Sequence, residues 1–206
     1  RHIAEVEKNQ TTRKAKQICF VSPVLPHPCE MEIWNEVVKN LGVRGVVITA
    51  QSERKGFTHF TDLCAALRAP VHLEARYLES TGENKSFLAD LESELEEATL
   101  VIAVGEVSLA SYQALKARRK YQHKLAIWQN APRPAEYLIQ GRAPVVGVNS
   151  VNLAREKTIR REVLRSCDAL LCFDKDSSTW AYLEDVNAQR IRRISRGVNL
   201  TRFSKE

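Results

Sequence analysis

The chain has 206 residues, of which 44% are apolar and 27% charged, and a formal net charge of +6. This composition is typical of a globular protein, and the length allows one large domain or two small ones with a buried core. No apolar run approaches the length of a membrane-spanning helix, and no signal peptide opens the sequence. Arg1 stands where a methionine would begin a complete protein, so we expect the chain to be part of a longer one.

The cysteines are odd in number and scattered, without a C-x-x-C pair, and several lie in apolar runs where a free thiol packs as a small hydrophobic group. The five histidines show no metal-ligand spacing either. We therefore expect a reduced, cytoplasmic protein without a metal site. The cysteines are Cys19, Cys29, Cys64, Cys167 and Cys172.

Basic residues form three groups along the chain, which favours an anionic partner. A solvated helix face explains each group by itself. Together the groups could dock to the inner, anionic face of a membrane, each residue contributing roughly 1 kcal/mol. Nucleic acid fits less well, because no helix-turn-helix or aromatic-studded strand pattern accompanies them. The groups are Lys116, Arg118, Arg119, Lys120 and Lys124; Arg155, Lys157, Arg160, Arg161 and Arg165; and Arg190, Arg192, Arg193 and Arg196.

The first part of the chain alternates between strand and helix. Residues 1–16 are polar and read as a leader or linker, and 18–22 is a short apolar run of buried-strand type. After a loop with three prolines, a helix is predicted to begin at Glu30 and to end at Gly42. Its inward face would carry Trp34, Val37, Val38 and Leu41. The next strand is predicted at 46–49.

The middle of the chain has weaker patterns. A short helix is predicted at 61–68 and a strand at 71–78. Asn84 could cap a helix with an inward face of Phe87, Leu88, Leu91 and Leu95. The clearest buried strand of the chain, 100–104, leads into a helix at 109–121.

The last part repeats the alternation. A strand at 125–128 is followed by a charged helix at 153–166 with Ile159, Val163 and Leu164 inward, and then by a strand at 169–173. Asp174 or Asp176 would cap a helix that carries Trp180, Leu183 and Val186. A final strand is predicted at 191–195, before Gly197 and Phe203.

Strands that are continuous apolar runs need cover on both faces, and alternation with helices indicates parallel pairing. The predicted fold is therefore α/β: a doubly wound, mostly parallel sheet with helices on both faces, in one Rossmann-like domain over residues 17–203. The sequence lacks two signatures of nucleotide-binding sites, G-x-G-x-x-G and G-x-x-x-x-G-K-[ST], and the signature of a catalytic serine, G-x-S-x-G. Nicotinamide and flavin enzymes, P-loop hydrolases and α/β-type serine hydrolases therefore lose support.

Ligands of open parallel sheets bind beyond the carboxyl ends of the strands, so the residues after each strand are the candidates. Glu106 follows the strand at 100–104 and could act as an acid, a base or a hydroxyl-binding group. It could equally be an acid that stabilises the N-terminus of the next helix. Gln129 and Asn130 follow 125–128 and suit hydrogen bonds to hydroxyls, or are ordinary loop residues.

The loop after the first strand supplies the remaining candidates. Ser22 ends the strand, and His27 and Glu30 lie where the loop meets the following helix. His27 could bind a ligand or transfer a proton, although a solvated loop histidine has the same pattern.

The last forty or so residues resemble the end of the N-terminal domain in retaining glycosyltransferases of the GT-B fold, of the group 1 type. That family has the pattern "aD-x-vi-x-x-S", a helix, and then "ki-x-vi-x-NGVD-x-x-x-F". Arg196 stands where Asn is usual and Asn199 where Asp is usual. The matching residues are Asp168, Leu170, Leu171, Ser177, Ile191, Ile194, Gly197, Val198, Asn199 and Phe203.

The resemblance implies the acceptor-binding half of an enzyme that transfers a sugar with retention. A nucleotide-sugar donor would be a substrate, with no cofactor or metal, and the acceptor a sugar or a lipid-linked molecule. Most of the donor site would lie in a second domain after residues 204–206, so this chain alone should be inactive. In the first loop, Pro28-Cys29-Glu30 replaces the glycine pair that usually approaches the donor diphosphate.

The resemblance also implies roles for particular residues. Glu106 would be catalytic, and Ser22, His27, Glu30, Gln129 and Asn130 would bind the acceptor. Arg196, Gly197 and Asn199 would form the hinge between the two halves, with Phe203 packed back onto this domain. The alternatives are a non-catalytic Rossmann-like module that docks to a partner or to an anionic membrane surface, and a small-molecule or nucleotide sensor of the same architecture.

Overall fold

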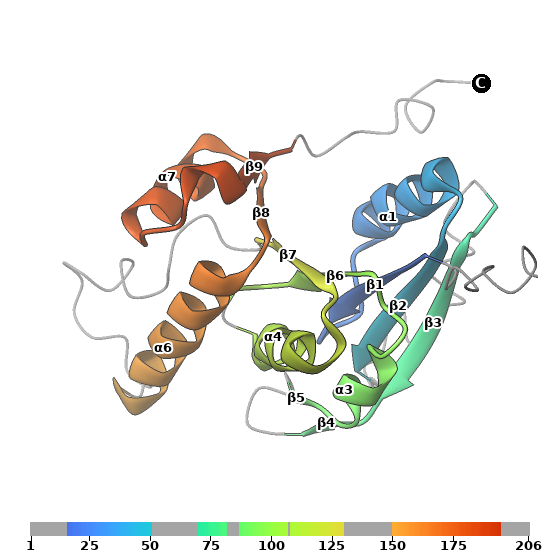
Figure 1. Cartoon of the computed structure of the whole chain (residues 1–206), viewed down its shortest axis with the longest axis horizontal. Coiled ribbons are helices and arrows are strands. Elements are labelled where there is room, and N and C mark those ends of the chain that lie inside the picture. The colour runs from blue at the N-terminus through green and yellow to red at the C-terminus, as the bar shows by residue number, and fades with distance from the viewer. Residues whose placement is uncertain (1–15, 51–69, 82–86, 107, 130–149, 195–206) are drawn as a thin grey trace, which may run out of the picture.

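The computed structural model describes residues 16–50, 70–81, 87–106, 108–129 and 150–194. In this part of the chain, seven parallel strands form one sheet in the order β3-β2-β1-β6-β7-β8-β9 (Figure 1). The strands are β1 (Gln17–Ser22), β2 (Arg44–Ala50), β3 (Leu73–Leu78), β6 (Leu100–Val104), β7 (Lys124–Trp128), β8 (Ala169–Cys172) and β9 (Ile191–Arg193).

The strand order reverses between β1 and β6. The chain first builds outward from β1 through β2 to β3, and then returns to the other side of β1 and continues through β6 to β9. This is the order of a Rossmann-like, doubly wound sheet, and it confirms the predicted α/β fold. The reversal places a topological switch point at the carboxyl ends of β1 and β6.

Helices cover both faces of the sheet (Figure 1). Helix α1 lies on one face, while α3, α4 and α6 lie on the other. Two apolar clusters fill the space between the layers, because successive strand residues point to opposite faces: Phe20 packs under α1 and Val21 on the α4 side. The helices are α1 (Pro28–Leu41), α3 (Leu91–Glu94), α4 (Leu109–Tyr121), α6 (Ser150–Ser166) and α7 (Lys175–Leu183).

The helix ends follow local sequence signals. Gly42 ends α1 with a φ of +60°, a conformation that glycine adopts without strain. Ser108 caps α4 by accepting hydrogen bonds from the amides of Ala110 and Ser111. Asp174 caps α7 by accepting one from Ser177, which decides between the two predicted capping residues.

The prediction of a helix that begins near Asn84 is wrong for its first part. Phe87–Leu88 forms a short strand, β5, which pairs antiparallel with β4 (Ser80–Thr81), and α3 begins only after Asp90. Gln113 of α4 holds β5 in place, because its side chain bonds to both the amide (3.0 Å) and the carbonyl (2.7 Å) of Leu88. Asn84 itself lies outside the described residues.

The apolar residues predicted to face inward do so with few exceptions. Leu88, Leu91 and Leu95 are buried, as are Ile159, Val163 and Leu164 of α6. Phe87 is instead 41% exposed, since its strand lies at the rim of the helical layer. Leu41 and Leu183 are also exposed, because each occupies the last position of its helix, where the helix leaves the core. The helix predicted at 61–68 and Phe203 lie outside the described residues.

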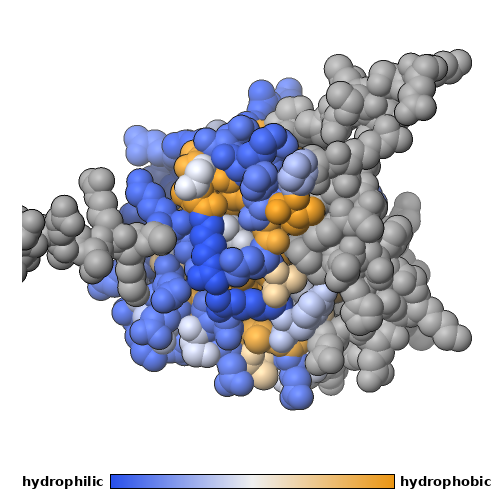
Figure 2. Space-filling view, turned by 90° about the vertical axis from the view of Figure 1, so that its right-hand side faces the viewer, coloured by the Kyte–Doolittle hydropathy of each residue, from blue (hydrophilic) through white to orange (hydrophobic). Residues whose placement is uncertain are grey.

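One side of the sheet ends at β3, whose outer edge is protected by charge. Arg44 of β2 pairs with Glu74 of β3 at 2.8 Å, and Arg76 of β3 pairs with Glu94 of α3. Figure 2, which views the molecule from this side, shows a largely hydrophilic face with small apolar patches. Charged side chains on an edge strand discourage pairing with other chains.

Most residues of the first two basic groups are paired with acids. Arg160 is 2% exposed and lies 3.0 Å from Glu184, which is also buried. This ion pair joins α6 to the end of α7. The interpretation of its group as a solvated face is therefore wrong for Arg160. The other pairs are Arg118 and Lys124 with Asp168, Arg119 with Glu162, Lys120 with Glu92, Arg161 with Glu184, and Arg165 with Asp185.

Among the described helices, none combines the length and the apolar character that a membrane span requires.

Candidate functional site

The candidate site lies at the switch point, at the carboxyl ends of β1 and β6. The two strands are neighbours, with Val21 paired to Ala103. The chain leaves β1 toward α1 on one face and leaves β6 toward α4 on the other, so the two connections diverge. A crevice between such diverging connections is where ligands bind in open α/β sheets.

Glu106 lies at this point and is 4% exposed. Gly105 precedes it in a left-handed conformation, with a φ of +86°, and this turns the chain out of β6. Two hydrogen bonds hold the turn: the Gly105 amide donates to Trp128 at 2.9 Å, and the Ser111 hydroxyl donates to the Gly105 carbonyl at 2.6 Å. The turn thereby places Glu106 two residues before Ser108, the residue that caps the N-terminus of α4.

Gln129 lies beside Glu106, directly after β7. Its amide donates to the carbonyl of Leu171 at 3.1 Å, which continues the pairing of β7 with β8. Its side-chain oxygen accepts a hydrogen bond from the thiol of Cys172 at 3.1 Å. Burial, followed by the charges of Glu106 and Asp174, raises the pKa of the Cys172 thiol to about 12, so the thiol stays a hydrogen-bond donor. The side-chain nitrogen of Gln129 is then the group that could donate to a ligand.

Ser22 and Thr49 form a second polar pair at the same edge, on the α1 face. They are register partners at the ends of β1 and β2, and both are buried. The Ser22 hydroxyl donates to the carbonyl of Val24 at 2.6 Å, which leaves its oxygen lone pairs as acceptors. The Thr49 hydroxyl has no hydrogen-bond partner among the residues that the structure describes. Sequence reasoning missed Thr49; the signal was a polar residue near the end of an otherwise apolar strand.

His27 and Glu30 hold the N-terminus of α1 at this edge. The Glu30 carboxylate accepts a hydrogen bond from the His27 amide at 2.9 Å, and Nδ1 of His27 accepts one from the Cys29 amide at 3.3 Å. This reciprocal arrangement is a capping box, built here with histidine in place of the usual serine or threonine. It gives both residues a structural role, and acceptor binding by them stays a prediction.

The strand that carries much of the sequence resemblance is present in the main sheet. β9 pairs parallel with β8, with Leu170 opposite Ile191, and the amide of Ile194 continues the ladder to Cys172 at 2.9 Å. Asn130 and the predicted hinge residues Arg196, Gly197 and Asn199 lie outside the described residues.

Asp168, which matches the family pattern, anchors the start of β8. Its carboxylate accepts hydrogen bonds from the Leu125 amide at 2.9 Å and from Arg118 at 3.1 Å. Burial opposes ionisation of Asp168, but these bonds and the nearby Lys124 outweigh burial and lower its pKa. In the described part of the chain, no group of three or more histidine, cysteine, aspartate or glutamate side chains is placed to hold a metal ion.

Several solved structures share this fold. HepE of Anabaena in complex with UDP and glucose superimposes with a TM-score of 0.60 at 14% identity, over 90% of this chain and 46% of HepE. The lipopolysaccharide outer core galactosyltransferase WaaB gives 0.57 at 11% identity, over 89% and 46%. The UDP-GlcNAc 2-epimerase of Methanocaldococcus jannaschii gives 0.55 at 10% identity, over 86% and 45%.

The chain therefore spans about half the length of the solved proteins that it resembles. Neither the protein-family models nor the curated proteins give a match to the sequence. WaaB is a galactosyltransferase and HepE was solved with UDP and glucose, so the predicted resemblance is confirmed at the level of the fold. The chain is a Rossmann-like α/β domain, and it shares this fold with HepE, WaaB and the UDP-GlcNAc 2-epimerase.

Proposed function

We propose that the chain is the acceptor-binding domain of a glycosyltransferase that uses a nucleotide-sugar donor and retains the configuration of the transferred sugar. The observation that carries the proposal is the buried Glu106 at the switch point of this fold, with Gln129 beside it. The resemblance to HepE, which was solved with UDP and glucose, supports a sugar-nucleotide substrate. The sequence pattern that ends in Phe203 supports the retaining type.

In this proposal the acceptor hydroxyl lies in the crevice and donates a hydrogen bond to Glu106. So that the configuration is retained, its oxygen forms a bond to the anomeric carbon of the donor sugar on the same face from which the diphosphate departs. The bond from that carbon to the diphosphate oxygen breaks, and the nucleoside diphosphate leaves with the electron pair. Glu106 takes up the hydroxyl proton as a general base. The side-chain nitrogen of Gln129 and the Ser22 oxygen orient neighbouring hydroxyls, by donating and accepting hydrogen bonds respectively.

The departing diphosphate needs stabilisation, and the carboxylate of Glu106, among the described residues of this crevice, would repel it. A second domain following residues 204–206 would supply that stabilisation, with Arg196, Gly197 and Asn199 as the hinge. The chain alone would then bind acceptor without transferring sugar.

Sugar-nucleotide epimerisation is the second candidate function, because the UDP-GlcNAc 2-epimerase of Methanocaldococcus jannaschii has the same fold over 86% of this chain. An epimerase needs no acceptor. Conversion of UDP-GlcNAc in the absence of any acceptor therefore separates the two functions.

A non-catalytic module that docks to an anionic membrane surface has less support. Most side chains of the first two basic groups are engaged with acids of the same domain, and Arg160 is buried. Each pair reduces the charge that could act on lipid headgroups.

The test uses the full-length protein encoded by the reading frame and the 206-residue chain in parallel. Both are incubated with UDP-glucose, UDP-galactose or UDP-GlcNAc and with a panel of free sugars and lipid-linked sugars, and UDP release and glycosylated products are measured. We expect acceptor-dependent UDP release by the full-length protein and none by the chain alone. Acceptor-independent conversion of UDP-GlcNAc would favour the epimerase. No turnover of any donor by the full-length protein would contradict both enzymatic functions.

A further inference from the structure

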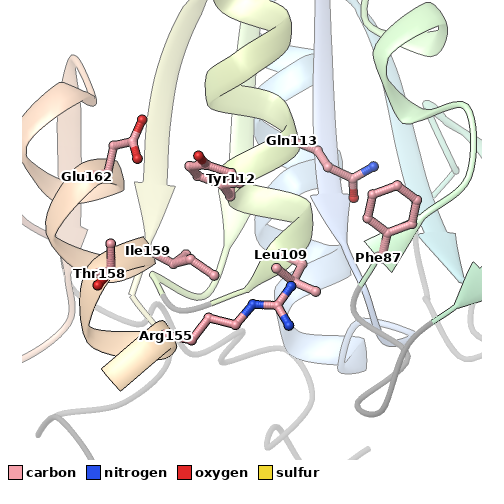
Figure 3. A pocket seen from close by; sticks show the side chains of 8 residues that line it. All are labelled: Phe87, Leu109, Tyr112, Gln113, Arg155, Thr158, Ile159 and Glu162. Carbon is pink, nitrogen blue, oxygen red and sulfur yellow. The ribbon is translucent and has the colours of Figure 1, made fainter. Parts of the chain in front are cut away.

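A cavity of about 470 Å³ opens between α4, α6 and β5, on the face of the sheet opposite α1 (Figure 3). Its volume falls within the range of small-molecule sites in proteins, roughly 300 to 1,000 Å³. The cavity is built on helices α4 and α6 and on β5, and it shares no residue with the crevice that contains Glu106 and Gln129.

The floor and one wall of the cavity are apolar. Leu109 and Tyr112 contribute from α4, Ile159 from α6, and Phe87 closes the side formed by β5. Phe87 is 41% exposed, so part of its ring is open to a ligand in the cavity. The wall that carries Phe87 is held in place, because Gln113 bonds to both backbone groups of Leu88.

Arg155 supplies a positive charge at the rim. Its side chain extends from α6 toward Leu109, as Figure 3 shows. Arg155 forms no ion pair within the described part of the chain, whereas Arg160, Arg161 and Arg165 of the same helix each lie beside an acid. Glu162, the acidic residue of the lining, is itself paired with Arg119 at 3.3 Å. The net charge that the cavity offers to a ligand is therefore positive.

We propose that this cavity binds a small amphipathic anion, with an aromatic or alicyclic body between Phe87, Tyr112 and Ile159 and a carboxylate on Arg155. The positive charge of Arg155 favours a negatively charged ligand, and guanidinium binds carboxylate through two parallel hydrogen bonds. The aromatic walls favour a flat body over a flexible one. This site is independent of sugar transfer, and its test has the same meaning whatever reaction the crevice supports.

The test compares two probes that differ only in charge, 2-naphthoate and 2-naphthamide. Each is titrated into the 15N-labelled chain, and backbone amide shifts are followed by two-dimensional NMR. We expect saturable shifts in α4 and in α6 around Arg155, with 2-naphthoate binding about tenfold more tightly than 2-naphthamide, the factor that one charge-assisted contact of modest strength provides.

Three variants separate the contributions of the lining. Arg155→Gln should weaken 2-naphthoate about tenfold and leave 2-naphthamide unchanged. Phe87→Ala should weaken both probes, because it removes the aromatic wall. Lys157→Gln, which removes a charge from an exposed position of α6 outside the lining, should change neither. Equal affinity for the two probes, an unchanged affinity in Arg155→Gln, or the absence of saturable shifts in the lining would each overturn the proposal.

Discussion

The thiol of Cys172 donates a hydrogen bond to the side-chain oxygen of Gln129 at 3.1 Å, and this bond joins the ends of β8 and β7. It determines which end of the Gln129 amide is free to face the crevice. The nearby Glu106 contributes to the raised pKa of the same thiol, so the three side chains form one buried polar cluster at the carboxyl edge of the sheet.

Removing this thiol should destabilise the domain. Cys172→Ala leaves the buried oxygen of Gln129 without its donor and opens a small cavity, so we expect a loss of about 1 to 2 kcal/mol in the free energy of unfolding. Cys172→Ser keeps a donor and should lose less. Urea unfolding measures the free energy of unfolding of the wild type and of each variant. Cys29→Ala, at an exposed position, is the control and should change stability by less than about 0.5 kcal/mol. Equal losses in Cys172→Ala and Cys29→Ala would show that the bond contributes nothing.

The cysteines should differ sharply in reactivity. Burial raises the pKa of Cys167 to about 11 and that of Cys172, with added effects of nearby charges, to about 12. The thiolate is the nucleophile, so iodoacetamide at pH 8 should alkylate the exposed Cys29 in the folded protein and leave Cys19, Cys167 and Cys172 unmodified. Peptide mass spectrometry follows each site. Labelling of Cys172 at the rate of Cys29 would contradict the buried placement of this strand.

The buried ion pair between α6 and α7 should contribute strongly to stability once either partner is removed alone. Among the described residues, Arg160→Ala leaves the buried carboxylate of Glu184 with only the more distant Arg161, so we expect a loss of about 3 kcal/mol in the free energy of unfolding. Arg165→Ala, which breaks an exposed pair with Asp185, is the matched control and should lose less than about 1 kcal/mol. The double variant Arg160→Met/Glu184→Leu should recover most of the loss. A large loss in that double variant would mean that packing, and not charge, explains the effect.

The sequence predicts the order of strands and helices because its strongest signals are local. The apolar run at 100–104 and the helix at 109–121 are found as predicted, and Gly42 ends α1 as the sequence indicates. Phe87–Leu88 shows where local signals fail: a helical spacing of apolar residues there is overridden by hydrogen bonds from Gln113, which is distant in sequence.

The candidate site could be predicted in part for a similar reason. The position of Glu106 and Gln129 follows from knowing where parallel strands end. The bond from Cys172 to Gln129, the capping role of His27 and the burial of Thr49 depend on how neighbouring strands and helices pack, which residue spacing does not determine. The pairing of Arg160 with Glu184 is likewise a tertiary contact, so the sequence alone indicated only a basic group.

His123 should make the domain sensitive to mild acid. It is buried, its Nε2 lies 3.2 Å from the carbonyl of Ala114, and burial lowers its pKa below 6.5. The unfolded chain then binds a proton more readily than the folded one, so stability is fully present above pH 6.5 and is lost as the pH falls below it.

The free energy of unfolding should fall by up to about 1.4 kcal/mol for each pH unit below 6.5. Urea unfolding of the wild type and of His123→Gln between pH 7 and pH 5 measures it, because glutamine keeps a donor for Ala114 but does not titrate. The difference between the two proteins should shrink as the pH falls. Parallel pH profiles would show that His123 has no such role. Asp168, whose pKa is lowered, loses its contribution only in stronger acid.

The most direct test of the proposed function compares Glu106→Gln with the wild type in acceptor-dependent UDP release by the full-length protein. Glu96→Gln is the matched control, because it makes the same chemical change at an exposed position between α3 and β6. If Glu106 takes up the acceptor proton, Glu106→Gln should lower kcat by about 100-fold or more while Glu96→Gln stays at the wild-type rate. A Glu106→Gln protein that folds and transfers sugar at the wild-type rate would contradict the account.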